Sequence, residues 1–314
     1  MLTIFSCPKP FRGHINIIQR NAIKSWTLLQ PRPEIILIGD DEGTEEICKE
    51  FGLRHIPEVE RNEYGTPLVS SVFRIGQSEA TNRLVCYINT DIMLMSDFIN
   101  SVKAINYKIP QQLFICVGRR WGIEVTDFWN FDDKDWEQKL REHVISKGKL
   151  GSIVSIDYFI FPRGLYEEIP PFALGRPRWD NWFIYATKAK RVPVIDMTSL
   201  SIVVHQNHDY SHIKEGAEIW LKRGLEAKKN LILRGGFFHM YTIWDSDLIA
   251  TPKGLQKTSI IRHISAYLLR IKAFFTYMLT DTIYPYSYPL ILLLKGVRGV
   301  LRIIALASKK IKFW

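Results

Sequence analysis

The segment from Leu84 to Leu94, LVCYINTDIML, constrains the fold of this chain more than any other part of the sequence. Its apolar residues do not alternate with polar ones, which is typical of a strand buried on both faces of a parallel sheet. The run is broken by Asn89, Thr90 and Asp91. Ligands of open α/β sheets bind at the carboxyl ends of the strands, and a buried carboxylate without a partner is costly. We therefore expect Asp91 to bind a divalent cation or a polar substrate group; a loop aspartate that caps a turn is the alternative.

The first 95 residues alternate between short apolar runs and segments with helical spacing. The expected strands are 2–6, 34–38, 54–59 and 84–90, and the expected helices are 16–29, a short one from Thr44, and 68–81. This alternation predicts βαβ units, a parallel sheet and an α/β fold class. The following part is less regular, with a helix from Ser96 and strands expected at 113–118, 153–161 and 200–204.

The net charge of +10 is concentrated near the carboxyl end. From Leu255 onward there are ten Lys and Arg residues against one acid, Asp281, which gives +9 and leaves about +1 for the first 254 residues. A nearly neutral main body argues against nucleic-acid binding. The change in composition predicts a main domain over 1–254 and a basic tail over 255–314.

The four cysteines, Cys7, Cys48, Cys86 and Cys116, are scattered along the chain. Their spacing fits neither a metal site nor a disulfide framework, so we expect buried free thiols in a reducing compartment. The amino-terminal residues lack the basic segment and long apolar run of a signal peptide, and we expect none.

A second group of reactive side chains lies between residues 175 and 212. Asp180 stands between Trp179 and Trp182, and an apolar strand is followed by His205, His208, Asp209 and His212. Two polar clusters at strand ends, about 90 residues apart in the sequence, predict a single site built from two lobes.

Together these features resemble a GT-A nucleotide-diphospho-sugar glycosyltransferase of the family-2-like, bacterial type. The resemblance rests on the βαβαβ start, the acidic pair after the second strand, and the stretches INTDIML, RWDNW and VVHQNHDYSH. It covers roughly residues 1–255 and implies a Rossmann-like, mostly parallel sheet with flanking helices. It also implies a nucleotide-binding half over 1–95 and an acceptor and catalytic half over 96–254.

The resemblance assigns roles by position. Asp91 would be the direct ligand of Mn²⁺ or Mg²⁺, in an N-T-D variant of the D-x-D motif where Asn89 adds no charge. His205 would complete the metal shell from the second lobe, since imidazole suits Mn²⁺. The residues expected to bind the nucleotide sugar are Ser6, Pro8, Asp40, Asp41, Asn89, Thr90 and Asp91.

The chemistry of sugar transfer matches the remaining residue types. The departing diphosphate gains negative charge, which a divalent ion stabilises. If the enzyme inverts, Asp180 is the expected catalytic base. Trp179 and Trp182 would desolvate this carboxylate and offer faces for a sugar ring, while Arg176 and Arg178 would contact phosphate or acceptor.

These assignments have structural alternatives. Asp180 could be the N-cap of a helix over 181–187, with both tryptophans in the core. His205 could be a hydrogen-bonded structural histidine. The spacing of His205, His208 and His212, with Asp209, could be forced into a zinc site, although no cysteine accompanies them. The Asp40-Asp41 pair could be an acidic turn before a helix.

Residues 255–314 have a different composition. Apolar residues dominate 260–283 and 289–307, and basic residues recur on one helical face at Lys295, Arg298, Arg302 and Lys309. Prolines interrupt the longest uncharged run, which is too short to span a bilayer. We expect basic amphipathic helices that bind an anionic membrane surface; the alternative is a helical pair packed on the main domain.

We therefore expect a cytoplasmic, metal-dependent glycosyltransferase held peripherally on the inner face of a membrane, with a glycan or lipid-linked acceptor. A sugar-phosphate nucleotidyltransferase is one rival, disfavoured because no Gly-rich phosphate loop follows the first strand. The other is an inactive, membrane-associated interaction protein of the same fold, which the uncharged Asn89 makes credible. Metal-dependent binding of a nucleotide sugar separates this rival from the enzymes.

Overall fold

The computed structural model describes residues 2–110, 112–208 and 224–277. The chain divides into two compact units, Met1–Tyr267 and Leu268–Trp314, and the site discussed below lies in the first. This division falls later along the chain than the change in composition at residue 255.

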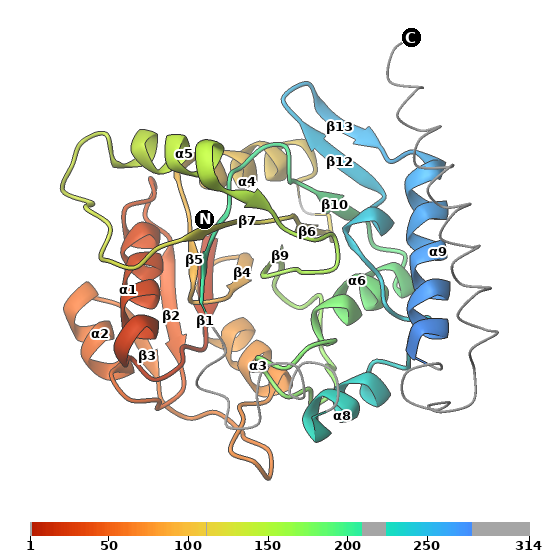
Figure 1. The fold of residues 1–314 in the computed structure, drawn as a ribbon, viewed down its shortest axis with the longest axis horizontal. Coiled ribbons are helices and arrows are strands. Elements are labelled where there is room, and N and C mark those ends of the chain that lie inside the picture. The colour runs from red at the N-terminus through yellow and green to blue at the C-terminus, as the bar shows by residue number, and fades with distance from the viewer. Residues whose placement is uncertain (1, 111, 209–223, 278–314) are drawn as a thin grey trace. The chain divides into compact units, whose positions relative to one another are not determined.

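The amino-terminal half alternates strands and helices as the sequence predicts (Figure 1). Its elements are β1 (Leu2–Ser6), α1 (Gly13–Thr27), β2 (Glu34–Ile38), α2 (Thr44–Phe51), β3 (Arg54–Ile56), α3 (Val69–Glu79), β4 (Leu84–Ile88), β5 (Ile92–Met93) and α4 (Ser96–Lys108). Strands β1 and β2 have the expected bounds, because turn-forming residues follow each apolar run, Pro8 after β1 and Gly39 after β2.

The second half has shorter strands and longer connections. Its elements are β6 (Ile115–Val117), β7 (Trp121–Glu124), α5 (Trp136–Lys147), β8 (Lys149–Leu150), β9 (Tyr158–Pro162), α6 (Asp180–Ala189), β10 (Val194–Asp196), β11 (Val204–Asn207), α8 (Leu225–Leu233), the 3₁₀ helix η1 (Ile243–Asp245), β12 (Leu248–Thr251), β13 (Gly254–Lys257) and α9 (Ile260–Tyr277).

Nine strands of the described chain form one mixed sheet in the order β13-β12-β10-β6-β9-β4-β1-β2-β3. Strands β4, β1, β2 and β3 pair in parallel, and so do β6, β10 and β12. Strand β9 runs antiparallel to both of its neighbours, β4 and β6. The mostly parallel α/β sheet expected from the sequence is therefore confirmed, with β9 and the edge strand β13 as the antiparallel members.

Helices cover both faces of this sheet. Within β4, Leu84 and Cys86 belong to a core shared with α1, α2 and α4, whereas Val85 and Tyr87 belong to a core shared with α3 and α6. Burial on both faces is what the continuous apolar run predicts. All four cysteines are buried and free, as expected.

A smaller sheet in the order β5-β11-β7-β8 packs with α5 in a third core. Strand β5 follows the N-T-D segment directly and pairs antiparallel with β11, where Val204 lies opposite Met93. The small sheet thus brings residues near 205 next to residues near 91, as the two-lobe expectation requires.

Strands β3, β4 and β6 are shorter than expected, and two other strand predictions were further off in their bounds. The strand expected at 153–161 begins only at Tyr158, because residues 152–155 form a turn in which the Ser155 amide donates to the Ser152 carbonyl. The strand expected at 200–204 begins only at Val204 and ends at Asn207. Gln206 is polar yet fully buried, since α1 and the Asp91 carbonyl satisfy its side chain.

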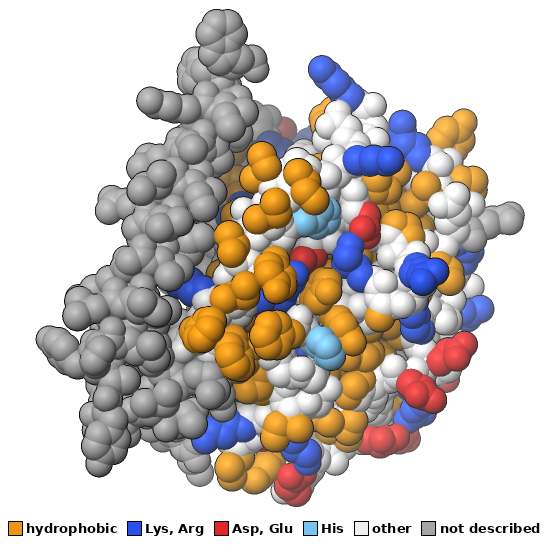
Figure 2. All heavy atoms as spheres, turned by 90° about the vertical axis from the view of Figure 1, so that its right-hand side faces the viewer, with side chains coloured by type: hydrophobic (Ala, Val, Ile, Leu, Met, Phe, Trp, Pro, Cys, Tyr) orange, Lys and Arg blue, Asp and Glu red, His pale blue; other side chains and the backbone are white. Residues whose placement is uncertain are grey.

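Helix α9 presents an apolar face. The side chains of Ile260, Ile261, Ile264 and Tyr267 are between 49% and 70% exposed, and Figure 2 shows hydrophobic side chains gathered on this side of the molecule. Within the described residues, none of the helices combines the length and the hydrophobicity that crossing a membrane requires. The expected helical segment over 289–307 lies outside the described residues.

Candidate functional site

Each residue of the N-T-D segment is fixed by a different element. The Asn89 amide group donates to Asp157, just before β9, at 2.9 Å. The Thr90 hydroxyl donates to Gln19 of α1 at 2.9 Å. The Asp91 carbonyl accepts from the backbone and side chain of Gln206, at 3.2 and 3.1 Å. The segment therefore has a defined conformation at the carboxyl end of β4.

Two histidines from the second lobe face the Asp91 carboxylate. Oδ2 of Asp91 lies 3.2 Å from Nε2 of His208 and 3.6 Å from Nε2 of His205. Oδ1 of Asp91 is buried and has no hydrogen-bond partner among the described residues. One ligand atom from each of these three residues lies within 4.8 Å of the others. One carboxylate, whose Oδ1 has no partner among the described residues, and two imidazoles form a donor set that suits a divalent cation.

The surroundings of His205 suit a metal ligand as well. Its Nδ1 lies 3.3 Å from Oδ1 of Asn207, whose amide in turn donates to Glu124. A ligating histidine commonly has its second nitrogen held in this way, which directs the other nitrogen toward the metal. Burial lowers the pKa of His205, and the facing Asp91 carboxylate opposes this effect.

The local charges keep Asp91 ionised. Burial raises the pKa of its carboxyl group, but His205, His208 and Lys9 together outweigh burial and hold this pKa well below its usual value. Lys9 lies in the loop after β1, where its backbone N–H and carbonyl both bond to Gln19 at 2.8 Å. Burial lowers the Lys9 pKa, while Asp91 raises it and Arg176 lowers it further.

Asp180 has an unusual environment for a carboxyl group. It begins α6, and Oδ2 accepts a long hydrogen bond of 3.4 Å from the Ile156 amide. Burial, with the charge of Asp157, raises its pKa to about 6. Helix α6 is capped by Trp179 rather than Asp180, so the N-cap alternative is wrong.

The two tryptophans beside Asp180 pack inward. Trp179 is 5% exposed and lies among Phe73, Tyr87 and Phe159. Trp182 is half-buried against Tyr166, Phe172 and Phe183. The ring faces of Trp179 lie in the core, which argues against its expected role in sugar stacking. Both rings contribute to the apolar surroundings of α6.

The two arginines before α6 already have protein partners. Arg176 pairs with Glu226 at 2.6 Å and donates to Thr66. The positive charge of Arg176 also lowers the pKa of Lys9 in the loop after β1. Arg178 donates to the Ala227 carbonyl at 2.8 Å.

The residues expected at the nucleoside end lie at the carboxyl ends of β1 and β2. Asp40 and Asp41 both bind Arg61, at 2.6 and 3.0 Å, and Asp41 is the more buried. The Ser6 hydroxyl is buried and donates to the Ile88 carbonyl, so only its backbone could meet a ligand. Pro8 is buried in the following loop.

Four residues of this region were missing from the sequence-based site, namely Lys9, Arg120, Asp157 and His208. His208 was considered only for a zinc site, and its supposed partners Asp209 and His212 lie outside the described residues. Arg120, directly before β7, forms an ion pair with Asp157, directly before β9. No sequence spacing reveals this pair, because antiparallel β9 alone brings these residues together.

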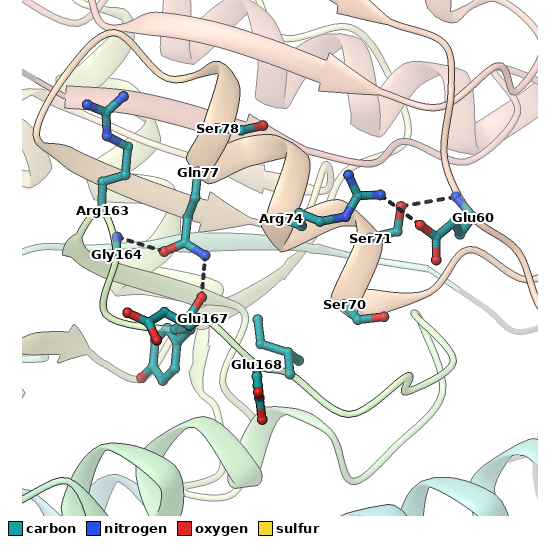
Figure 3. Close-up of a pocket in the computed structure, with 12 residues that line it drawn as sticks. Glu60, Ser70, Ser71, Arg74, Gln77, Ser78, Arg163, Gly164, Glu167 and Glu168 are labelled. Carbon is teal, nitrogen blue, oxygen red and sulfur yellow. Dashed lines mark hydrogen bonds and ion pairs between the residues drawn. The ribbon is translucent and has the colours of Figure 1, made fainter.

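A separate groove of about 570 Å³ lies between α3 and the loop after β9 (Figure 3). Gln77 of α3 joins the two sides, accepting from the Gly164 amide at 3.0 Å and donating to the Tyr166 carbonyl at 2.8 Å. None of the candidate residues named above lines this groove. We place the candidate site by its chemistry and assign no ligand to the groove.

Comparison with solved structures identifies the fold. Residues 1–349 of Staphylococcus aureus TarS, in complex with UDP-GlcNAc, superpose with a TM-score of 0.50 at 10% identity, covering 89% of this chain and 74% of that one. The chain has the GT-A fold. No protein-family model matches the sequence, and no curated protein matches it significantly.

Two other structures are similar at lower scores. Mannosyltransferase PcManGT from Pyrobaculum calidifontis, in complex with GDP-Man and Mn²⁺, has a TM-score of 0.43 at 14% identity, over 96% of this chain and 80% of that one. Glucosyl-3-phosphoglycerate synthase from Mycobacterium tuberculosis, with Mn²⁺, UDP and phosphoglyceric acid, has a TM-score of 0.43 at 14% identity, over 75% and 78%. On the GT-A fold, the candidate site of this chain lies at the carboxyl ends of β1, β2 and β4.

The donor set yields a first prediction. Replacing Asp91 by Asn removes the only carboxylate of the three-residue cluster, so Mn²⁺ affinity should fall by more than the roughly 10- to 100-fold typical of an outer-shell loss. His208→Ala should also weaken binding, whereas His143→Ala on α5 serves as a matched control. Titration calorimetry or Mn²⁺ electron paramagnetic resonance measures the affinity. Unchanged Mn²⁺ binding by Asp91→Asn would contradict the proposed ligand set.

Proposed function

We propose that this protein transfers a sugar from a nucleoside-diphosphate sugar to a glycan or lipid-linked acceptor, with the help of Mn²⁺ or Mg²⁺. The observation that carries the proposal is the carboxylate of Asp91, buried at the carboxyl end of β4 with an unpartnered oxygen and two facing imidazoles. The UDP-GlcNAc held by TarS, which shares the fold, supports a nucleotide-sugar donor.

The metal would be held by Asp91, His205 and His208. When bound, it neutralises negative charge on the diphosphate as the bond to the sugar breaks. Two imidazoles in the donor set favour Mn²⁺ over Mg²⁺, which prefers oxygen ligands. The positive charge of Lys9, which lowers the pKa of Asp91, would add to the charge of the metal at this site. The protein thus offers the diphosphate positive charge of its own.

The nucleoside would lie against the carboxyl ends of β1 and β2. Asp41, with Asp40 and Arg61 beside it, offers acceptor oxygens for ribose or base. The backbone around Ser6 and Pro8 would line the base. This arrangement follows the general rule that ligands of α/β sheets bind at the carboxyl ends of parallel strands.

Asp180 is the residue that we propose takes the proton from the acceptor hydroxyl. A general base works best when its pKa is near the working pH, and burial raises the Asp180 pKa to about 6. The neighbouring charge of Asp157 raises it in the same direction. A carboxylate with this pKa is ionised at neutral pH yet basic enough to accept a proton.

A nucleotide panel tests the proposed function. The full chain is titrated with UDP, GDP, CDP and dTDP, each with and without Mn²⁺, and we expect one of them to bind only with the metal. Asp91→Asn should lose this binding, while Asp247→Asn, at the opposite edge of the sheet, should keep it. If no nucleotide binds with or without Mn²⁺, the result would refute the transferase proposal and support the alternative of an inactive interaction protein.

The role of Asp180 predicts a pH profile. Because the raised pKa keeps the carboxyl group protonated below about pH 6, kcat should decline as the pH falls through that value. Asp180→Asn should lower kcat by about 10²- to 10⁴-fold while nucleotide binding stays nearly unchanged. Transfer or hydrolysis of a sugar donor that carries the nucleotide found in the panel measures kcat, and calorimetry with that nucleotide measures binding. Full activity of Asp180→Asn would assign the base elsewhere.

We further propose that the protein binds the inner face of a membrane through the apolar face of α9. Ile260, Ile261, Ile264 and Tyr267 are exposed there, and Lys253 and Lys257 are exposed on the adjoining β12–β13 hairpin. Apolar side chains flanked by cations suit an anionic lipid surface, where each cation near the surface contributes about 1 kcal/mol.

Vesicle sedimentation tests this attachment. The full chain should bind phosphatidylserine-containing vesicles more than pure phosphatidylcholine vesicles, and less as salt rises. The double variant Ile260→Glu and Ile264→Glu should reduce binding. Ile232→Glu, a change at a 78% exposed position on α8, is the matched control. Equal binding by wild type and the double variant would refute a membrane role for this face.

A further inference from the structure

The side chain of Asn89 uses both ends of its amide. Its Oδ1 accepts from the Tyr87 hydroxyl at 2.9 Å, and its Nδ2 donates to Oδ1 of Asp157 at 2.9 Å. The backbone N–H of Asn89 also donates to the Asp157 carbonyl at 3.0 Å. Three hydrogen bonds therefore fix this residue, and two of them lead to Asp157.

An aspartate could not make the same contacts at position 89. It could accept from Tyr87, but its other oxygen would face the Asp157 carboxylate, which is only 14% exposed. Two carboxylates at hydrogen-bond distance repel each other strongly when water is largely excluded. Asp157 therefore requires a hydrogen-bond donor at position 89, which an amide provides. The aspartate of a complete D-x-D motif would instead repel the Asp157 carboxylate.

Asp157 also holds a cation. Its Oδ2 forms an ion pair with Nε of Arg120, whose side chain is 21% exposed. The charges of Arg120 and Asp157 both affect His205, and the charge of Asp157 affects Asp180 as well. Charges that adjoin Asn89 therefore act on both the metal-ligand cluster and the proposed base.

We propose that Asn89 and Asp157 form one amide–carboxylate unit, in which Asp157 supplies the charge that a D-x-D motif carries at its first position. Asp157 is then a positioning residue: it fixes the start of the N-T-D segment and keeps Arg120 beside the site. This inference rests on the proposed function and deepens it. It also removes the reason for taking Asn89 as the sign of an inactive protein.

The pairing of Asn89 with Asp157 predicts that restoring a complete D-x-D motif weakens binding. If position 89 were a degraded metal ligand, Asn89→Asp would raise Mn²⁺ affinity. In the paired unit it places two carboxylates in contact, so Asn89→Asp should lower Mn²⁺-dependent nucleotide affinity, by about 10- to 100-fold. Asp157→Asn keeps an amide that Asn89 can still bond but removes the charge opposite Arg120, and should weaken binding similarly.

The double variant Asn89→Asp with Asp157→Asn exchanges the two groups and is the decisive test. The hydrogen bond then runs from the amide at 157 to the carboxylate at 89, and the local charge is that of the wild type. We expect most of the affinity for Mn²⁺ and nucleotide to return. A general structural defect would not be repaired in this way, because both single changes are present together.

The readouts are Mn²⁺ affinity alone, affinity for the nucleotide found in the panel, and the melting temperature of each variant. Asp247→Asn, another aspartate with an ion-pair partner and a backbone contact, is the control for the chemical change itself. Higher Mn²⁺ affinity in Asn89→Asp, or no recovery in the double variant, would overturn the inference. Absence of metal and nucleotide binding in the wild type would instead overturn the proposed function, and this inference with it.

Discussion

Burial of the Asp91 carboxylate is the constraint on which the candidate site depends. Removing a charge from water is expensive unless compensating charges or hydrogen bonds are present. Here His205, His208 and Lys9 supply the compensation, and they come from β11, from the residue after it and from the loop after β1. No single element carries enough of this environment, so Asp91 can be buried and ionised only when both sheets are assembled.

Helix α1 connects these parts through its inner face. Trp26 donates to the Ile92 carbonyl at 2.8 Å, directly after the N-T-D segment. Asn21 donates to the side chain of Gln206, and Gln206 donates to the Ile18 carbonyl. A helix that packed only apolar side chains on the sheet would make none of these hydrogen bonds to the small sheet. The buried polar residues of α1 join the sheets and thereby set the position of β11 relative to Asp91.

The sequence allowed the first half of the fold to be predicted more accurately than the second. Strands β1 and β2 are each followed by turn residues, and their apolar runs left little choice of bounds. Strand β11 contains His205 and Gln206, whose burial depends on partners far along the chain, so hydrophobicity alone placed it too early. Asp91 and His205 were found as a pair because each adjoins an apolar run. Asp157 and Arg120 were missed, since only the antiparallel pairing of β9 brings them to the site.

The charges around the site favour a metal and a diphosphate that bind together. A dication alone would meet the positive charges of Lys9 and Arg120, whose effects reach Asp91 and His205. A diphosphate alone would meet Asp91, Asp157 and Asp180, which lie in one electrostatically coupled region. Each repulsion is relieved by the other ligand, because the combined complex carries less net charge than either part. Opposite fixed charges on a buried, hydrogen-bonded frame would thus favour the complex, and a neutral Asn89 is compatible with the metal-dependent chemistry that we propose.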